Sequence, residues 1–277
     1  MPELPEVEHV ARSLETLVRG RVITAVELRR PRLAPDTTPA DFASALAGAA
    51  INFVHRRGKH ILFDLDNGRT LITHLRMSGR FSLLPAETED PKFAHAVFQF
   101  ADEQRLVFDD VRHFGLMKIV ETTVLHEAKE LAKLAPEPFS DEFTPDYLRS
   151  KLAGSKRSLK EFLLDQTKVC GLGNIYACEA MFAARLRPEI PADTVSSKKA
   201  GRLFEAIRAV LGEAIEHAAA SNVDAQNIDG GYFNGPSERG WFVYDRENEP
   251  CVNCNSPIVR LKQGGRSTYY CRRCQRK

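Results

Sequence analysis

The chain has 277 residues, of which 43% are hydrophobic, and a formal net charge of +2. This length suits two or three modest hydrophobic cores, and the composition argues against broad disorder. No apolar run approaches the roughly 20 residues of a membrane span, and the early acidic residues Glu3, Glu6 and Glu8 exclude a basic-then-apolar secretion signal. We therefore expect a cytoplasmic protein without a membrane segment.

The predicted elements change in character along the chain. Apolar residues at helical spacing predict a helix over residues 3–19, with Pro5 in its first turn and Gly20 just after its end. Residues 21–120 contain β-rich segments separated by turns, which predicts a β-sandwich or barrel with the first helix against it. Residues 135–145 resemble a linker, residues 145–220 have helical spacing, and residues 221–240 are expected to form a loop. The predicted fold class is α+β.

Positive charge is concentrated at the C-terminal end. Residues 251–277 contain seven Lys or Arg residues and no Asp or Glu, so removing this +7 from the total of +2 leaves −5 for the rest. A basic module on a mildly acidic body indicates contact with a polyanion, most commonly nucleic acid. A solvated basic tail is the alternative.

Four of the six cysteines form two Cys-x2-Cys pairs separated by sixteen residues. They are Cys251, Cys254, Cys271 and Cys274. This spacing is typical of a four-cysteine Zn²⁺ site, and the intervening residues 258–270 predict a β-hairpin. Disulfides are the alternative, which a cytoplasmic chain disfavours. Four thiolates leave no open coordination position, so we predict one structural Zn²⁺, while Cys170 and Cys178 are expected to be buried core fillers.

The first residues offer a different chemistry. Removal of the initiator methionine would leave a secondary amine on Pro2, and an α-amino group titrates near about 8, so part of it is unprotonated at neutral pH. Such an amine can attack a sugar C1′ and form a Schiff base, whose charged iminium makes the C2′ proton acidic and allows phosphate elimination. Glu3 could shuttle protons, and Glu6 could organise the site through hydrogen bonds. The alternative is that both carboxylates only favour the start of a helix.

An ordered series of motifs resembles the formamidopyrimidine-DNA glycosylase family, relatives of endonuclease VIII. The chain starts with MPELPEVE, and the finger cysteines end the series. Between them, in family order, lie RGK (57–59), HLRMSG (74–79), DVRHFG (110–115), LAPEP (134–138), LLDQ (163–166) and GLGNIYA (171–177). Each motif is weak alone, but their ordered combination over essentially the whole chain is specific. Leu4 favours the formamidopyrimidine branch, because the endonuclease VIII branch usually has glycine there.

The resemblance implies three domains. Residues 1–134 would form the catalytic helix and β-sandwich domain, residues 135–224 a helix–two-turn–helix DNA-binding domain, and residues 225–277 a lesion-loop region with the zinc finger. It also implies a monomeric DNA glycosylase and abasic-site lyase of base excision repair, acting on double-stranded DNA that contains damaged bases or abasic sites. Oxidised or ring-opened purines, namely 8-oxoguanine and formamidopyrimidine, would be removed through a Schiff base on Pro2 and β,δ-elimination.

The resemblance further assigns roles to single residues. Pro2 is the nucleophile, Glu3 the general acid/base and Glu6 an active-site carboxylate. The remaining catalytic candidates are Lys59, beside the lesion, and Arg266, a phosphate-binding arginine close to the active site. The DNA-binding candidates are His74, Met77, Arg112, His113, Phe114, Lys160, Asn174 and Arg266.

Three of these candidates match the family's void-filling trio. Met77, Arg112 and Phe114 would occupy the gap that remains when a damaged nucleotide leaves the helix. The alternative is ordinary core packing for Met77 and Phe114 with a surface arginine. For Asn174 the alternative is a helix cap, and for Arg266 it is a solvated turn charge.

Departures from the family's usual sequence limit what the resemblance implies. His113 replaces an arginine, so a phosphate contact there is expected to be weaker or pH-sensitive. Ala135 replaces a linker glycine, a change of minor expected effect. Residues 221–235 differ from the loop that caps flipped 8-oxoguanine in relatives, which leaves oxidised pyrimidines or hydantoins open as preferred substrates. A non-catalytic zinc-finger protein that binds damaged DNA is the alternative function, although the intact Pro2, Glu3 and Lys59 argue against it.

Overall fold

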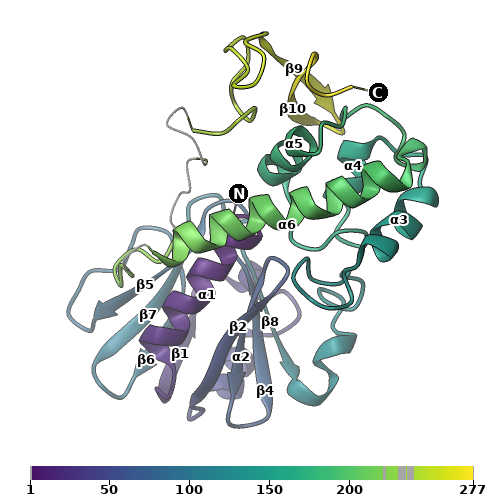
Figure 1. Cartoon of the computed structure of the whole chain (residues 1–277). Helices are drawn as coiled ribbons and strands as arrows, with labels where there is room; N and C mark the ends of the chain where they lie inside the picture. Colours follow the sequence, from purple (N-terminus) through teal and green to yellow (C-terminus); the bar gives the residue numbers. More distant parts are fainter. Residues whose placement is uncertain (1, 221–222, 230–234, 236–239, 277) are drawn as a thin grey trace. The chain divides into compact units, whose positions relative to one another are not determined.

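The structure is a computed structural model that describes residues 2–220, 223–229, 235 and 240–276. The chain forms two compact units (Figure 1). Unit 1 comprises Met1–Ala132 and Ala218–Tyr232, and unit 2 comprises Lys133–His217 and Phe233–Lys277. Among the described residues, no helix combines the length and the apolar character that crossing a membrane requires.

Unit 1 contains two four-stranded antiparallel sheets, which confirms the predicted sandwich. The first sheet has the order β1-β6-β7-β5 and the second the order β2-β3-β4-β8. The strands of the first sheet are β1 (Ile23–Leu28), β5 (Gly79–Pro85), β6 (Ala94–Phe100) and β7 (Gln104–Asp110). Those of the second are β2 (Ile51–Arg57), β3 (His60–Leu65), β4 (Arg69–His74) and β8 (Leu116–Glu121). Helical segments of this unit are α1 (Leu4–Val18), η1 (Pro31–Leu33), α2 (Pro39–Leu46) and η2 (Thr122–Glu127).

The helix α1 lies within one residue of the predicted bounds at each end. Val7, Val10 and Leu14 recur at helical spacing and are buried, so one face of α1 enters the core of unit 1. Glu15 also fixes α1 to the second sheet, because its Oε2 accepts a hydrogen bond from the Val54 N–H of β2 at 2.6 Å. The first residues of the chain are therefore held on a packed helix.

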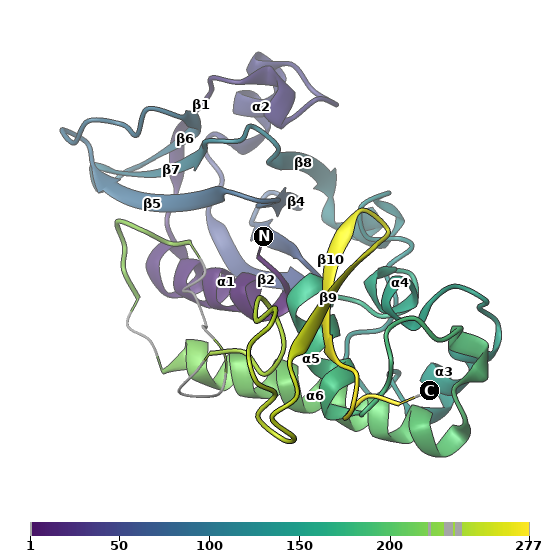
Figure 2. The same cartoon turned by 90° about the horizontal axis from the view of Figure 1, so that it is seen from above.

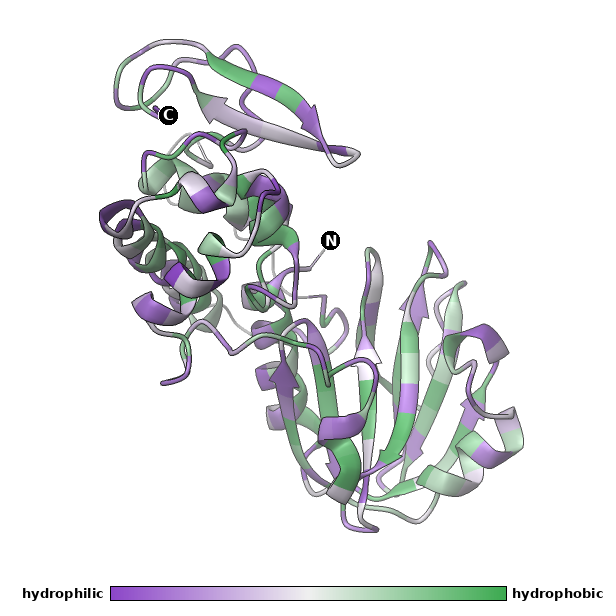
Figure 3. Cartoon of the chain, turned by 90° about the vertical axis from the view of Figure 1, so that its right-hand side faces the viewer, coloured by the Kyte–Doolittle hydropathy of each residue, from purple (hydrophilic) through white to green (hydrophobic). Residues whose placement is uncertain are grey.

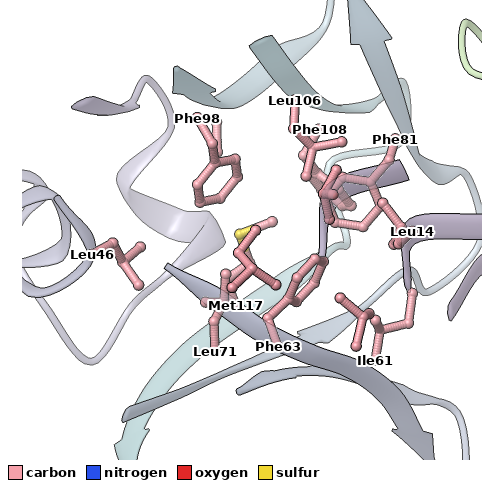
Figure 4. Packing of buried hydrophobic residues seen from close by; sticks show 14 of the residues in the cluster. Leu14, Leu46, Ile61, Phe63, Leu71, Phe81, Phe98, Leu106, Phe108 and Met117 are labelled. Carbon is pink, nitrogen blue, oxygen red and sulfur yellow. The ribbon is translucent and has the colours of Figure 1, made fainter. Parts of the chain in front are cut away.

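Aromatic rings from both sheets fill the core of unit 1 (Figure 4). The centroid of the Phe81 ring lies 5.8 Å from that of Phe63 and 5.1 Å from that of Phe108, both in edge-to-face geometry. Such tilted pairs are the favoured arrangement of aromatic side chains. Hydropathy agrees with this packing, since hydrophobic stretches interrupted by hydrophilic residues run along the strands of unit 1 (Figure 3). The loops at the edges of the sandwich are therefore attached to a well-packed core.

The segment after the last helix returns to unit 1. The backbones of Ile228 and Phe81 form a bridge, with N···O distances of 2.8 and 3.2 Å, and the Leu83 N–H donates to the Ala225 carbonyl at 2.7 Å. Ile228 is also buried in the core. The predicted loop of residues 221–240 is therefore anchored on β5 over its described residues 225–228, while residues 221–222, 230–234 and 236–239 lie outside the described part.

The described part of unit 2 contains helices and one β-hairpin, as predicted. Its helices are α3 (Pro145–Ala153), α4 (Leu159–Leu164), α5 (Asn174–Ala183), η3 (Ala192–Thr194) and α6 (Ser197–Ala219), the last of which ends in unit 1. The hairpin consists of β9 (Ile258–Gln263) and β10 (Arg266–Cys271), and β10 packs against α5 (Figure 2).

Candidate functional site

The N-terminal candidates lie at the first turn of α1. Glu3 is the N-cap of this helix, and its carboxylate accepts a hydrogen bond from the Glu6 N–H while the Glu6 carboxylate accepts the Glu3 N–H at 2.8 Å. This reciprocal capping box satisfies two amides that a helix start leaves unpaired. Glu3 is buried and Pro2 is partly exposed. Both carboxylates therefore take part in the start of α1, and the buried Glu3 directly follows Pro2 in the chain.

Lys59 and His74 occupy neighbouring positions of the second sheet. Lys59 lies in the two-residue turn between β2 and β3, where Gly58 has a φ of 60° that suits a tight hairpin. His74 ends β4, and its Nδ1 accepts the Arg76 N–H at 2.9 Å. The His74 ring meets the ring of His60 edge-to-face at 4.7 Å. All three side chains are buried, with exposures of 7 to 9%.

Burial keeps the two imidazoles neutral. It lowers the pKa of His60 to about 4, and the Nδ1 of His60 has no hydrogen-bond partner. Burial is also the main cause that lowers the pKa of His74, with a further contribution from His60 itself. A neutral His74 carries no charge to attract a phosphate, so any contact that it makes with DNA is a hydrogen bond rather than an ion pair.

The void-filling candidates project from two adjacent loops. Gly79 of β5 pairs with Asp110 of β7, so the loop before β5 and the loop after β7 lie side by side. Met77 is 42% exposed and Phe114 is 53% exposed, and the Arg112 guanidinium lies 5.3 Å from the centre of the Phe114 ring. These exposures do not suit core packing, the alternative for Met77 and Phe114.

Asp110 organises both loops. Its Oδ2 accepts the N–H groups of Phe114 and Gly115, each at 2.7 Å, and its Oδ1 accepts the Arg112 N–H at 3.1 Å and the Ser78 hydroxyl. Burial would raise the pKa of the Asp110 carboxyl, but these hydrogen bonds lower it below its usual value. The ionised carboxylate thus fixes the backbone that carries Arg112 and Phe114.

His113, on the same loop, is exposed and contacts a histidine of the first sheet. Its Nδ1 lies 2.8 Å from the Nε2 of His95 on β6, and the two ring centroids are 4.9 Å apart. His113 adopts a left-handed backbone with a φ of 61°, which is uncommon for a residue with a side chain. Burial lowers the pKa of His95, and the neighbouring His113 lowers it further. A phosphate contact by His113 would compete with this histidine pair.

In unit 2, Asn174 begins α5 as its first helical residue. The N-cap is Gly173, so Asn174 is not the helix cap that the alternative interpretation proposed. The Asn174 Nδ2 donates to the Ser267 carbonyl of β10 at 2.9 Å, and its Oδ1 is buried without a hydrogen-bond partner. Asn174 therefore joins the start of α5 to the finger hairpin.

Lys160 supports this corner from inside the protein. It is fully buried, and its Nζ donates to the Asn174 carbonyl at 2.8 Å and to the Cys178 Sγ at 2.9 Å. The Lys160 ammonium is buried and donates its hydrogen bonds to protein atoms. It is therefore not in a position to contact the DNA backbone directly, as the sequence had indicated. Cys178 is buried as predicted, although it accepts a hydrogen bond and is more than a filler.

Glu179 fixes the segment that leads into the finger. Its carboxylate is buried and accepts the N–H groups of Phe242, Val243 and Tyr244 at 2.9 to 3.0 Å. Burial raises the pKa of Glu179 despite these three hydrogen bonds. The same helix thus holds the hairpin through Asn174 and the preceding segment through Glu179.

The finger hairpin carries Arg266 at its tip. Gly264 and Gly265 both have positive φ values, 53° and 77°, as a tight two-residue hairpin turn requires. Arg266 follows as the first residue of β10 and is exposed. Its position matches the predicted Gly-Gly turn, where its guanidinium is accessible to an anion.

The four finger cysteines fit a tetrahedral metal site. All six cysteines of the chain are free thiols, and the four finger sulfurs lie within 4.8 Å of one another. The Sγ atoms of Cys251 and Cys274 are 3.8 Å apart, and those of Cys254 and Cys271 are 3.4 Å apart. A tetrahedron with Zn–S bonds of about 2.3 Å has S···S edges of about 3.8 Å. The observed separations are close to this edge, so the four cysteines suit a Zn²⁺ ion.

Family models match most of the chain in three successive segments. Residues 1–117 match the formamidopyrimidine-DNA glycosylase N-terminal domain, and residues 134–225 match the H2TH domain of the same family. The chain belongs to the formamidopyrimidine-DNA glycosylase family. Residues 248–276 match a zinc finger found in FPG and IleRS, in agreement with the four-cysteine cluster.

Curated family members are similar over their whole length. The formamidopyrimidine-DNA glycosylases of Bacillus licheniformis and Dinoroseobacter shibae are each 43% identical to this chain, with 100% of both sequences covered. Solved structures of a Lactococcus lactis Fpg agree with the fold. Its complex with DNA containing an abasic site has a TM-score of 0.90 at 33% identity and covers 99% of this chain and 100% of that one. Its complex with N7-benzyl-Fapy-dG DNA has a TM-score of 0.91 at 33% identity, with 100% of both chains covered.

Sequence reasoning missed several residues that hold these family motifs in place. Asp110 lies within a quoted motif, and its acidic side chain ahead of turn amides is a known local signal. His95 and Glu179 gave no such signal, because their partners are distant in sequence. Each can be identified only once strand pairing and helix packing are known.

Proposed function

We propose that this chain excises damaged bases from DNA and then cuts the strand, with Pro2 as the covalent nucleophile. The observation that carries the proposal is the Pro2-Glu3-Glu6 arrangement at the start of α1, in a chain whose full length matches the family. The glycosylase activity belongs to base excision repair, and the lyase activity is typical of the family. We also propose that the protein is a bacterial-type repair enzyme that acts in the cytoplasm.

In the first step the Pro2 nitrogen bonds to the sugar C1′. The bond between C1′ and the base breaks, and the base leaves with the electron pair and takes up a proton. The C1′–O4′ bond then breaks, and O4′ takes up the proton that the Pro2 nitrogen loses. Because Pro2 is a secondary amine, the ring-opened sugar is held as a cationic iminium. The Glu3 carboxylate, which is buried and belongs to the residue directly after Pro2, is proposed as the proton carrier.

Strand cleavage follows from the same intermediate. Removal of a C2′ proton expels the 3′ phosphate by β-elimination, and a second elimination expels the 5′ phosphate. Water then releases the sugar fragment from Pro2. Lys59, at the tight β2–β3 turn, is proposed to contact DNA close to the lesion.

The remaining candidates are proposed to bind DNA. Met77, Arg112 and Phe114 fill the gap left by the extruded nucleotide, since two large apolar side chains and a cation lie exposed on adjacent loops. Asn174 and Arg266 bind the backbone, and Lys160 positions Asn174 from inside. The zinc finger, with Zn²⁺ on its four cysteines, keeps the hairpin that presents Arg266 folded.

The lesion preference rests on the family. The Lactococcus lactis Fpg has been captured with N7-benzyl-Fapy-dG DNA and with oxidised-pyrimidine DNA. We propose ring-opened and oxidised purines as the substrates of this chain, with oxidised pyrimidines or hydantoins as the second candidate class, because residues 221–235 differ from the family's usual loop. Rates of base release from duplexes carrying each lesion would rank them.

Borohydride trapping tests the nucleophile. Protein with a free Pro2 terminus is mixed with abasic-site duplex and borohydride. It should form a covalent protein–DNA adduct, and peptide mapping should locate the attached sugar on Pro2. The control is the same protein with its terminal amine acetylated, which should bind the duplex without an adduct or a cut. If the free-terminus protein binds the duplex but neither attaches to it nor cuts it, the non-catalytic DNA-binding alternative replaces this proposal.

A further inference from the structure

A cationic pocket of about 480 Å³ lies at the base of the finger in unit 2. Its basic lining residues come from the end of α5, the start of α6 and the second cysteine pair. They are Arg185, Lys199, Arg202, Arg273 and Arg276. No Asp or Glu is among its described lining residues, and within the described part of the chain none of these five cations forms an ion pair with a carboxylate.

Arg185 occupies a backbone position that ordinarily selects glycine. The helix α5 ends in a paired capping motif, in which Arg185 N–H donates to Phe182 O at 3.0 Å and Leu186 N–H to Met181 O at 2.9 Å. The residue after the cap in this motif is left-handed, and Arg185 has a φ of 56°. A long cationic side chain here costs stability relative to glycine, which suggests that the side chain itself is needed.

The start of α6 also departs from the usual charge pattern. The first turn of a helix favours acidic residues, because the helix dipole is positive there. In α6 this turn contains Lys198 and Lys199 and no acidic residue. Lys199 lines the pocket and Arg202 follows it one turn later. The end of α5 and the start of α6 thus each carry a cation at a position where it lowers stability, and both cations line the same pocket. Such local departures are expected at a functional site.

A buried glutamine holds the pocket in shape. Gln275 is fully buried, and its Oε1 accepts the Cys271 N–H while its Nε2 donates to the Leu186 carbonyl, both at 2.8 Å. A parallel bridge between Leu186 and Arg276 continues this attachment. Arg185 and Arg276 are thus held next to each other by the backbone, despite the repulsion between their charges.

The finger metal does not account for all of this charge. A Zn²⁺ ion with four thiolates carries a net charge of −2, and Cys254 and Cys274 line the pocket. Two of the five positive charges would be offset in this way, and three remain. We propose that this pocket binds adjacent phosphate groups, as a nucleic-acid backbone or a free oligophosphate presents them.

This site is separate from the one at the finger tip. Arg266 and Cys271 are the first and last residues of β10, so the base of the hairpin lies about 17 Å from its tip at the usual rise of a strand. The pocket therefore goes beyond the proposed function, which uses Arg266. It would bind phosphates even in a protein that has lost its base-excision activity.

Calorimetric titration of the zinc-loaded protein tests the proposal with inorganic tripolyphosphate and with a short oligothymidylate. The variant is R202S/R273S, and the matched control is K156S/K198S, which removes the same charge from exposed positions outside the pocket. The tripolyphosphate affinity should fall at least about tenfold in the pocket variant and remain near wild type in the control. Zinc content and unfolding midpoint without ligand should match in all three proteins.

The two ligands distinguish the source of the phosphates. The same loss of affinity for oligothymidylate identifies a nucleic-acid backbone as the ligand. The salt dependence of this binding should also be shallower in the pocket variant, by about 1.4 in log–log slope, because two charges that contact a single strand are lost. A contrast with tripolyphosphate alone identifies a free oligophosphate. Equal affinities of the pocket variant and the control for both ligands would overturn the proposal.

Discussion

At the scale of single residues, the two loops that carry the void-filling side chains depend on one carboxylate. Asp110 is fully buried and accepts backbone hydrogen bonds at both of its oxygens, and through the Ser78 hydroxyl it joins the loop of Met77 to the loop of Arg112 and Phe114. Gly79 lies beside this junction, where a Cβ would come within 2.6 Å of the Leu75 carbonyl oxygen. The loops that carry the exposed void-filling side chains are therefore closely packed at the points where they leave the sheet.

The substitution Asp110→Asn should disable the loops without removing the nucleophile. An amide nitrogen in place of Oδ2 cannot accept the N–H groups of Phe114 and Gly115, which would cost roughly 1–3 kcal/mol for an unsatisfied buried donor. We expect base release from lesion duplexes to fall, while cutting of a single-stranded abasic site remains, because no gap has to be filled there.

Single-turnover rates on the two substrates would measure this difference. Asp102→Asn is the matched control, since the Asp102 carboxylate is exposed and pairs with Arg21 at the surface. An equal loss of activity on duplex and single-stranded substrates would show that Asp110 does not act through the void-filling loops.

At the scale of elements, α5 holds the finger at two points. Asn174 bonds to β10 at the start of the helix, and Glu179 accepts three amides of the segment that precedes the first cysteine pair. Both contacts lie within unit 2. A short helix thereby fixes the orientation of the hairpin that carries Arg266.

Glu179→Gln should loosen the finger while its metal site stays intact. The amide nitrogen of glutamine would face the Phe242 N–H, so one of three buried amides loses its acceptor. We expect weaker binding to duplexes containing an abasic analogue, with an unchanged zinc content. Fluorescence anisotropy and metal analysis measure the two quantities, and Glu216→Gln on the exposed face of α6 is the control. Unchanged affinity in Glu179→Gln would mean that the finger does not need this attachment.

Local signals in the sequence were sufficient for α1, the strand-rich region and the finger, but not for helix α2 within the predicted strand region or for the contacts between elements. The period of Val7, Val10 and Leu14 predicted α1, and the spacing of the cysteines with Gly264 and Gly265 predicted the finger. The burial of Lys160 could not be predicted, because its partners Asn174 and Cys178 become neighbours only when α4 and α5 pack. The pairing of His95 with His113 likewise depends on which loops the strand register brings together.

At the scale of the whole molecule, buried histidines link stability to pH. The pKa of His60 is about 4 in the folded chain and its ordinary value is 6.5. Between these values the unfolded chain binds a proton that the folded chain does not, so the free energy of unfolding falls as the pH drops below about 6.5. His74 acts in the same direction, because burial lowers its pKa as well.

His60→Gln should therefore reduce the acid sensitivity of unit 1. Between neutral pH and a pH near 5, protonation of His60 in the unfolded chain should lower the wild-type free energy of unfolding by about 2 kcal/mol. In the variant this contribution should be absent. Urea midpoints at neutral and acidic pH give the comparison. An identical pH dependence in both proteins would show that His60 is not the proton-linked group.

The docking of Ile228 on β5 sets a boundary for engineering the lesion specificity of this enzyme. Because Ala225 and Ile228 already belong to the sandwich through Leu83 and Phe81, a transplanted recognition loop should be spliced in after Ile228. Grafts that begin earlier would remove the backbone pairing with β5 and the buried Ile228 side chain from unit 1. A change in substrate preference could then not be separated from a loss of stability.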